Sequence, residues 1–301
     1  INQVENRAPI MRGNSAGKHT LLAVDDALAA IIAMLPKTGT DVLRLGDALG
    51  YTLAEDLVAR LTLPPQAVSA MDGYAVRGED VSTLPCQLTR VAESAAGHPW
   101  SGALNAGQAV RVFTGAVIPN GADTIVIQED VDPVAEQDGV IITVRSAEPA
   151  GRYIRQAGLD VTKGQVILSA GTQLSARAIG LASAAGLTEA LVSMRPRIGV
   201  LSTGDELVYP GEIPGLGQII SSNASFLMGF LTASGADVVD LGIVRDTPGA
   251  MVSSVRNAEN LDLIVTTGGA SVGVHDHIVS DIDNSEGSEL NFWKIAMRPG
   301  K

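Results

Sequence analysis

The stretch IGVLS at residues 198–202 is a short, almost wholly apolar run, and residues 238–243 and 261–266 form two more runs of the same kind. Runs of this length fit strands that are buried on both faces. Between them we predict two helices, one capped by Asn223 and one beginning at Thr247-Pro248, where proline suits the first helical position. Strands and helices that alternate at this spacing predict a parallel sheet with right-handed crossovers.

Residues 61–145 have a different pattern, in which short β-branched runs are bounded by glycine and proline. Such runs occupy residues 110–113 and 124–127, and Asp138-Gly139 has the residue types of a hairpin turn ahead of a further run at 141–144. We therefore predict a small β domain that is inserted between other parts of the chain.

The segments on either side of this β-rich region are mixed. We expect helices at residues 24–35, 47–58 and 175–185, the first of which ends before Pro36. The predicted fold is α/β plus β in several domains: a disordered lead at 1–19, a mixed helical linker domain at 20–60 and 146–194, the inserted β domain at 61–145, and a βαβ parallel-sheet domain at 195–301.

The composition of the 301-residue chain excludes several classes of protein. Hydrophobic residues make up 46% of it, which is too many for a disordered chain. Lysine and arginine total 21 against 33 acidic residues, and this net charge of -12 argues against nucleic-acid binding through a general basic face. The single cysteine, Cys86, excludes an intrachain disulfide and suits a cytoplasmic protein. No apolar run reaches the roughly 20 residues of a membrane span.

Candidate binding and catalytic residues follow the ends of the predicted strands. Ligands of an open parallel sheet bind beyond the carboxyl ends of its strands. Carboxylates follow the first two strands, at 205–206 and at Asp246, and a glycine-rich loop at 268–273 follows the third. A fourth expected strand, 291–297, leads into a basic tail. Taken one at a time, these features are typical of ordinary turns, helix starts and solvated surfaces.

Together, these features predict a metal-dependent site for a phosphorylated small molecule. The backbone N–H groups of a glycine-rich loop can approach a phosphate closely. Carboxylates at the same edge would repel that phosphate unless a hard cation lies between them, and Mg²⁺ needs only one or two carboxylates besides phosphate oxygens. Zinc at His275-Asp276-His277 is less expected, because no third ligand lies nearby in the sequence.

The same segments resemble the molybdopterin molybdenumtransferase family, to which the E domain of gephyrin belongs. The likeness covers residues 20–301, and its motifs follow the order of the family: MDGYA at 71–75, FTGA at 113–116, GAD at 121–123, STGDEL at 202–207, GGASVG at 268–273 and MRPGK at 297–301. The resemblance implies an elongated chain with a molybdopterin-binding α/β domain. It also implies that the family's C-terminal β-barrel domain, expected after Lys301, is absent.

The resemblance implies a function as well. The family takes adenylylated molybdopterin and molybdate, inserts molybdenum into the dithiolene and releases AMP, with Mg²⁺ as cofactor. Its members are homodimers, with the active site between the α/β domain of one subunit and the β domain of the other. The expected partners are therefore the pterin nucleotide, molybdate, a second copy of the chain and molybdopterin adenylyltransferase, with neither nucleic acid nor membrane among them.

Roles for single residues follow from their positions in the family's motifs. Catalytic roles fall on Asp72, Thr114, Asp160, Glu206, Asp246, Asp276, Lys294 and Arg298. Substrate-binding roles fall on Arg155, Thr203, Gly204, Gly268, Gly269, Ser271, Gly273 and Lys301. Asp246 and Asp276 are the expected Mg²⁺ ligands, although Val274 stands where the family usually has a further acidic residue.

Two other functions fit the same sequence. One is a scaffold dimer that binds the pterin without turnover. A soluble dimer that releases no AMP would favour this alternative. The other is molybdopterin adenylyltransferase, which shares the α/β domain and would react ATP with molybdopterin. Residues 20–193 argue against the second alternative, because that enzyme is a single α/β domain.

Overall fold

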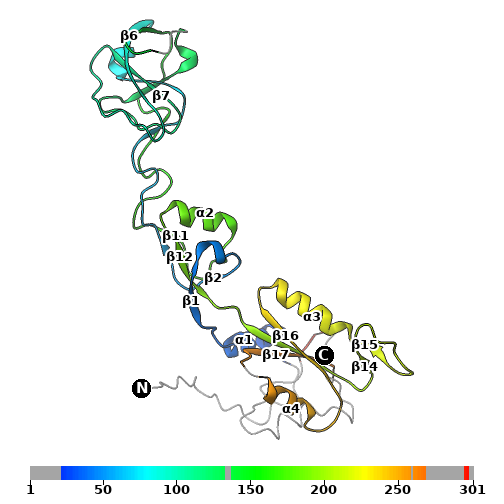
Figure 1. Ribbon diagram of the computed structural model, residues 1–301. Helices are drawn as coiled ribbons and strands as arrows, with labels where there is room; N and C mark the ends of the chain where they lie inside the picture. The colour runs from blue at the N-terminus through cyan, green and yellow to red at the C-terminus, as the bar shows by residue number, and fades with distance from the viewer. Residues whose placement is uncertain (1–21, 133–136, 259, 269–294, 298–301) are drawn as a thin grey trace, which may run out of the picture. The chain divides into compact units, whose positions relative to one another are not determined.

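The computed structural model of the chain describes residues 22–132, 137–258, 260–268 and 295–297. The chain divides into two compact units (Figure 1). Residues 1–40 and 193–301 belong to the first, which we call the α/β unit, and residues 41–192 form the second, which we call the β unit. The predicted mixture of a parallel α/β part and a β-rich part is confirmed at this level.

The α/β unit is built on a parallel sheet. Strand β13 (Arg197–Thr203) lies between β16 (Asp237–Val244) and β17 (Leu263–Thr267), and both neighbours run parallel to it. Helix α3 (Ser222–Ala233) connects β13 to β16 and contacts both, and α4 (Ala250–Asn257) connects β16 to β17. The two helices lie on opposite sides of the strands (Figure 1). The three strands predicted from the apolar runs are therefore confirmed.

Both helices of this sheet begin at positions other than those predicted. The N-cap of α3 is Ser221 rather than Asn223, whose side chain instead donates to Thr267 Oγ1 at 3.2 Å. Helix α4 follows Gly249 rather than starting at Thr247-Pro248. The N–H of Ala250 donates to the carbonyl of Thr247 at 3.1 Å, so Thr247-Pro248 forms a separate turn that precedes the helix.

Three further elements complete the described part of the α/β unit. Helix α1 (Val24–Met34) confirms the helix expected at 24–35. The short strands β14 (Leu207–Val208) and β15 (Ile219–Ile220) pair in parallel. Residues 291–294 of the expected fourth strand lie outside the described residues, but Ile295 forms a parallel bridge with Leu22.

The centre of the β unit is a five-stranded sheet with the order β8-β5-β7-β6-β9. Its strands are β5 (Gly73–Val76), β6 (Cys86–Ser94), β7 (Gln108–Val112), β8 (Thr124–Ile127) and β9 (Ile141–Val144). Strand β7 runs parallel to β6 and antiparallel to β5. Both faces of the sheet are covered, because successive residues of these strands belong to two different core clusters. The β-rich region expected at 61–145 is confirmed in its secondary structure.

A second group of strands in the β unit packs around helix α2 (Ala176–Ala184), whose N-cap Ser175 accepts from the N–H of Ala178. Strand β12 (Glu189–Ser193) lies between β1 (Thr40–Arg44) and β2 (Thr52–Leu53), and β3 (Leu57–Val58) pairs with β11 (Val166–Leu168). The helix predicted at 175–185 is confirmed.

The helix predicted at 47–58 is wrong. A single 3-10 turn, η1 (Leu45–Asp47), is followed by Gly50 with a φ of 78° and then by β2 and β3. The N–H groups of Leu53 and Ala54 donate to carbonyls of residues 172 and 191, far away in the sequence. These long-range backbone bonds outweigh the modest helix propensity of the segment.

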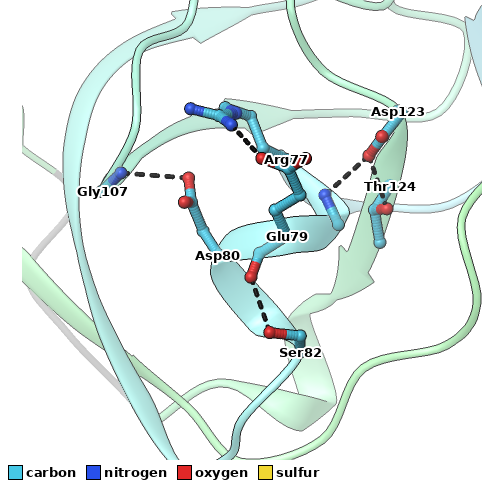
Figure 2. A network of polar contacts seen from close by, with 8 residues as sticks. Arg77, Glu79, Asp80, Ser82, Gly107, Asp123 and Thr124 are labelled. Carbon is cyan, nitrogen blue, oxygen red and sulfur yellow. Dashed lines mark hydrogen bonds and ion pairs between the residues drawn. The ribbon is translucent and has the colours of Figure 1, made fainter.

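A network of polar contacts fixes the 3-10 turn η2 (Gly78–Val81), which follows β5 (Figure 2). Oδ1 of Asp123 accepts from the N–H of Gly78 at 2.7 Å and from the hydroxyl of Thr124 at 2.8 Å. Asp80 accepts from the N–H of Gly107 at 3.0 Å. Asp123, in the GAD motif, therefore caps a turn, which is a structural role.

Candidate functional site

The carboxyl ends of β13 and β17 meet in tight backbone contact. Thr203 ends β13, and Gly268, with a φ of 97°, directly follows β17. A Cβ on Gly268 would overlap the carbonyl oxygen of Thr203, so only glycine fits there. The hydroxyl of Thr203 is buried and has no hydrogen-bond partner within the described part of the chain. The strand ends therefore present closely packed backbone and one unused hydroxyl group.

Carboxylates gather at the same edge of the sheet. The N–H of Asp246 donates to Oδ1 of Asp205 at 3.3 Å, and Arg245 donates to the carbonyl of Asp205 at 2.6 Å. The carboxylate of Glu206 lies over Gly204, where an added Cβ would be 2.6 Å from Oε2. The loops that follow β13 and β16 are thus tied together, and the carboxylate of Asp205 lies against the backbone of Asp246.

Five of the predicted site residues lie at this edge: Thr203, Gly204, Glu206, Asp246 and Gly268. Another seven lie outside the described residues: Gly269, Ser271, Gly273, Asp276, Lys294, Arg298 and Lys301. Asp205 and Arg245 received no role from the family's motifs. Asp205 was nonetheless among the carboxylates expected at the strand ends, and Arg245 lies next to Asp246.

The donor chemistry of this edge fits Mg²⁺. Asp205, Glu206 and Asp246 offer only oxygen atoms, which are the ligands of hard cations. Among the described residues no three His, Cys, Asp or Glu side chains come close enough to enclose an ion. Mg²⁺ does not require such a cage, since it retains water and binds one or two carboxylates together with substrate phosphates. This acidic edge (Asp205, Glu206 and Asp246), next to Gly268, therefore suits Mg²⁺ bound jointly with a phosphorylated ligand.

Asp72 and Thr114 form a pair at one end of the β unit's sheet. Asp72 precedes β5 and Thr114 follows β7, and these antiparallel neighbours bring the two positions together. Oδ1 of Asp72 accepts from the N–H of Thr114 at 2.7 Å and from its hydroxyl at 2.9 Å. These bonds, first the backbone and then the hydroxyl, hold the pKa of Asp72 below its ordinary value of 3.8, and the charge of Arg111 adds to them.

Arg155 and Asp160 form a second pair, with Nη2 of Arg155 at 2.7 Å from Oδ2 of Asp160. Their side chains are 44% and 42% exposed. The N–H of Asp160 donates to the carbonyl of Leu63 at 3.0 Å, which fixes the loop that carries it. The pair is therefore open to solvent on a constrained backbone.

One short ladder links these two pairs. Strand β10 (Ile154–Arg155) pairs antiparallel with β4 (Val68–Ser69). The backbone of Ser69 also accepts from the N–H of Gly115 and donates to the carbonyl of Ala116, both at 2.8 Å. Strand β4 thus touches both the loop of Thr114 and the strand of Arg155. The four predicted residues of the β unit are grouped around it.

Two family models match the chain. The model described as the MoeA N-terminal region (domain I and II) matches residues 22–186, and the one described as a probable molybdopterin binding domain matches residues 199–301. The first covers most of the β unit, and the second covers the parallel sheet of the α/β unit.

Named relatives are similar over nearly the whole chain. It is 36% identical to molybdopterin molybdenumtransferase of Haemophilus influenzae over 93% of its own length and 69% of that protein. It is also 36% identical to the enzyme of the same name from Nostoc, over 93% of its own length and 65% of the relative. The crystal structure of the molybdopterin biosynthesis MoeA protein from Pyrococcus horikoshii has a TM-score of 0.74 at 30% identity, and the alignment covers 83% of this chain and 67% of that one. The chain thus spans about two thirds of the length of these relatives.

Proposed function

This chain belongs to the molybdopterin molybdenumtransferase family of molybdenum cofactor biosynthesis, and we propose that it inserts molybdate into adenylylated molybdopterin with Mg²⁺ and releases AMP. The observation that carries the proposal is the acidic edge at the ends of β13 and β16 beside Gly268. An edge of this kind suits a pyrophosphate that is bound together with a cation.

In the α/β unit, Asp246 would hold Mg²⁺ together with Asp276, and Glu206 lies close enough to the edge to assist. When bound there, Mg²⁺ would neutralise the charge of the pyrophosphate and polarise the phosphorus atom. At this edge the chain itself would offer the ligand the closely packed backbone at Gly268. It also has the hydroxyl of Thr203, which has no hydrogen-bond partner among the described residues. Lys294, Arg298 and Lys301 would bind the oxyanions of phosphate or molybdate, as the family's basic residues do.

In the β unit, the chain provides a carboxylate that stays ionised. Both bonds from Thr114 reach Oδ1 of Asp72, so Oδ2 has no donor among the residues that the structure describes. That oxygen is available to accept a hydrogen bond or a proton from the substrate. Arg155 and Asp160 keep each other in position, and the guanidinium of Arg155 retains N–H groups for an anionic ligand.

The test of the proposed function is release of AMP from adenylylated molybdopterin in the presence of molybdate and Mg²⁺. We expect release by the wild-type chain, almost none by Asp72→Asn, and wild-type rates for Asp132→Asn. Asp132 is a matched control, because it belongs to the same unit but pairs with Arg145 away from the site. A folded wild-type protein that binds the pterin and releases no AMP would contradict the proposal and favour the scaffold alternative.

We further propose that two copies of the chain act as a homodimer in the cytoplasm. If residues of two subunits complete one active site, mixing Asp72→Asn with Asp246→Asn should restore part of the activity that each variant lacks. Mixed dimers that form but remain inactive would contradict a shared site. The single cysteine, which is typical of proteins in reducing compartments, supports the location.

A further inference from the structure

Arg111 is a buried cation in the middle of the β unit's sheet. It lies on β7 opposite Tyr74 of β5 and is only 6% exposed. Its strand neighbours Val110 and Val112 are fully buried apolar residues. An arginine is unusual in such a position, because burying a charge costs free energy of folding unless its surroundings compensate.

Aromatic rings and backbone provide part of that compensation. The Cζ atom of Arg111 lies 5.2 Å from the ring centroid of Tyr74 and 4.9 Å from that of Phe113, within the range of cation–π attraction. Within the described residues, its Nε has no hydrogen-bond partner and no carboxylate forms an ion pair with the guanidinium. A large apolar side chain would fill this space without those costs, so stability alone does not explain Arg111.

The hydrogen bonds of Arg111 lead to the backbone carbonyls of Asp72 and Gly73. Nη1 donates to the carbonyl of Gly73, the next residue in the chain, at 3.3 Å. Nη2 donates to Oε1 of Gln128 at 2.9 Å, and the N–H of Gln128 in turn donates to the carbonyl of Asp72 at 3.1 Å. The guanidinium therefore holds the two peptide groups that follow the Cα of Asp72, the nearer one through Gln128 and the next one directly.

The positive charge of Arg111 acts on the carboxylate of Asp72. Thr114 donates to Oδ1 from two neutral groups, and Oδ2 has no donor in the part of the chain that the structure describes. Among the described residues, Arg111 on the neighbouring strand is the charged group that helps to lower the pKa of Asp72, after the two bonds from Thr114. A nearby cation that does not itself bond to the carboxylate stabilises the negative charge while leaving the free oxygen accessible.

We propose that Arg111 is a positioning residue that fixes the backbone of Asp72 and supplies the positive charge that keeps its free oxygen ready for substrate. The inference rests on the proposed role of Asp72. It assigns a function to a residue that itself remains buried and does not touch the substrate.

The test compares Arg111→Met, Arg111→Lys and the control Arg90→Met. Arg90 is equally buried in the adjacent strand β6, but its ion pairs are with Glu93 and Asp138 rather than near Asp72. Carbon-13 NMR titration of the Asp72 carboxyl group should give a higher pKa in Arg111→Met, since a cation has been removed. The pKa should be partly restored in Arg111→Lys and unchanged in Arg90→Met. Gln128→Leu, which removes only the acceptor for Nη2, provides a second variant if Arg111→Met does not fold.

Kinetics supply the second measurement. The kcat for AMP release should fall on the order of tenfold to a hundredfold in Arg111→Met, which is the loss expected from misplacing a reacting group. The acidic limb of its pH profile should move to higher pH, a change that general loosening of the fold would not produce. An unchanged Asp72 pKa and an unchanged kcat in a folded Arg111→Met protein would overturn the inference, while Asp72→Asn could still abolish activity. A raised pKa with no effect of either Arg111→Met or Asp72→Asn on the rate would instead overturn the proposed role of Asp72.

Discussion

The predicted site residues of the β unit are held by one another, whereas those of the α/β unit are not. Thr114 satisfies one oxygen of Asp72, and Arg155 pairs with Asp160. At the strand ends of the α/β unit, Glu206 and Asp246 form no ion pair with any described residue. The paired residues of the β unit therefore hold one another in place. At the acidic edge, the described cation Arg245 bonds to the backbone carbonyl of Asp205, and the carboxylates of Glu206 and Asp246 are left for the cation that we propose.

The largest expected effect tests the acidic edge. Asp246→Asn should weaken binding of adenylylated molybdopterin in Mg²⁺ on the order of 10- to 100-fold, since loss of a contributor to a metal site costs at least that much. Asp237→Asn is the control, because it lies at the opposite end of β16 and pairs loosely with Arg197 at 3.8 Å. Isothermal titration calorimetry measures both affinities. Equal affinities for the two variants would mean that Asp246 does not contribute to the cation site.

The next effect tests the tight backbone contact at the edge. Gly268 and Gly235 have almost the same φ, 97° and 96°, but a Cβ on Gly235 would meet open space. Gly235→Ala should lower the free energy of unfolding by about 1–2 kcal/mol through its φ alone. Gly268→Ala should cost more than Gly235→Ala, because its Cβ also overlaps Thr203. Urea denaturation of both variants gives the comparison, and equal losses would contradict a contact that only glycine permits.

A smaller effect tests the scaffold of the β unit. Asp123→Ala removes the acceptor for the Gly78 N–H and the Thr124 hydroxyl (Figure 2). The free energy of unfolding should fall by about 0.5–2 kcal/mol, as it does when a capping residue is lost. Asp132→Ala breaks a surface pair with Arg145 and should cost about 0–1 kcal/mol. If thermal or urea unfolding ranks the two variants the other way round, Asp123 is not the cap that the contacts indicate.

The smallest expected effect is the contribution of Asp72, in the β unit, to the pH dependence of the free energy of unfolding. The pKa of Asp72 is lowered below 3.8 in the folded chain, so its ionised form contributes stability above that pH. This contribution is lost as the pH falls from 3.8 through the lowered value of the folded state. Thr114→Val removes one of the two bonds and should lose less stability over this range than the wild type. Unfolding curves recorded between neutral pH and about pH 3 test this, and parallel pH profiles would contradict it.

Local patterns in the sequence were sufficient for the elements that bury apolar runs. The run at 198–202 became β13, and the capped segment at 175–185 became α2, because burial of a local pattern decides both. The segment 47–58 was not predictable in this way, since its backbone bonds go to residues more than a hundred positions away. The start of α3 depended likewise on tertiary contacts, which make Ser221 the N-cap and turn Asn223 toward Thr267.

The candidate site also has parts that local sequence patterns predict and parts that depend on tertiary contacts. That carboxylates would meet at the strand ends followed from the predicted parallel sheet, because its topology brings those ends together. The pairing of Asp72 with Thr114 had no local signal, since it depends on the pairing of β5 with β7. Arg111 did leave a signal that was missed: it is a charged residue inside the apolar run AVRVF at 109–113.

The central claim is that the acidic edge of the α/β unit binds its pterin nucleotide through a divalent cation. Calorimetric titration of the wild-type protein with adenylylated molybdopterin, with and without Mg²⁺, tests it directly. We predict binding at least about tenfold tighter with Mg²⁺, which corresponds to about 1.4 kcal/mol. An affinity that is the same in Mg²⁺ and in a chelator would contradict the claim.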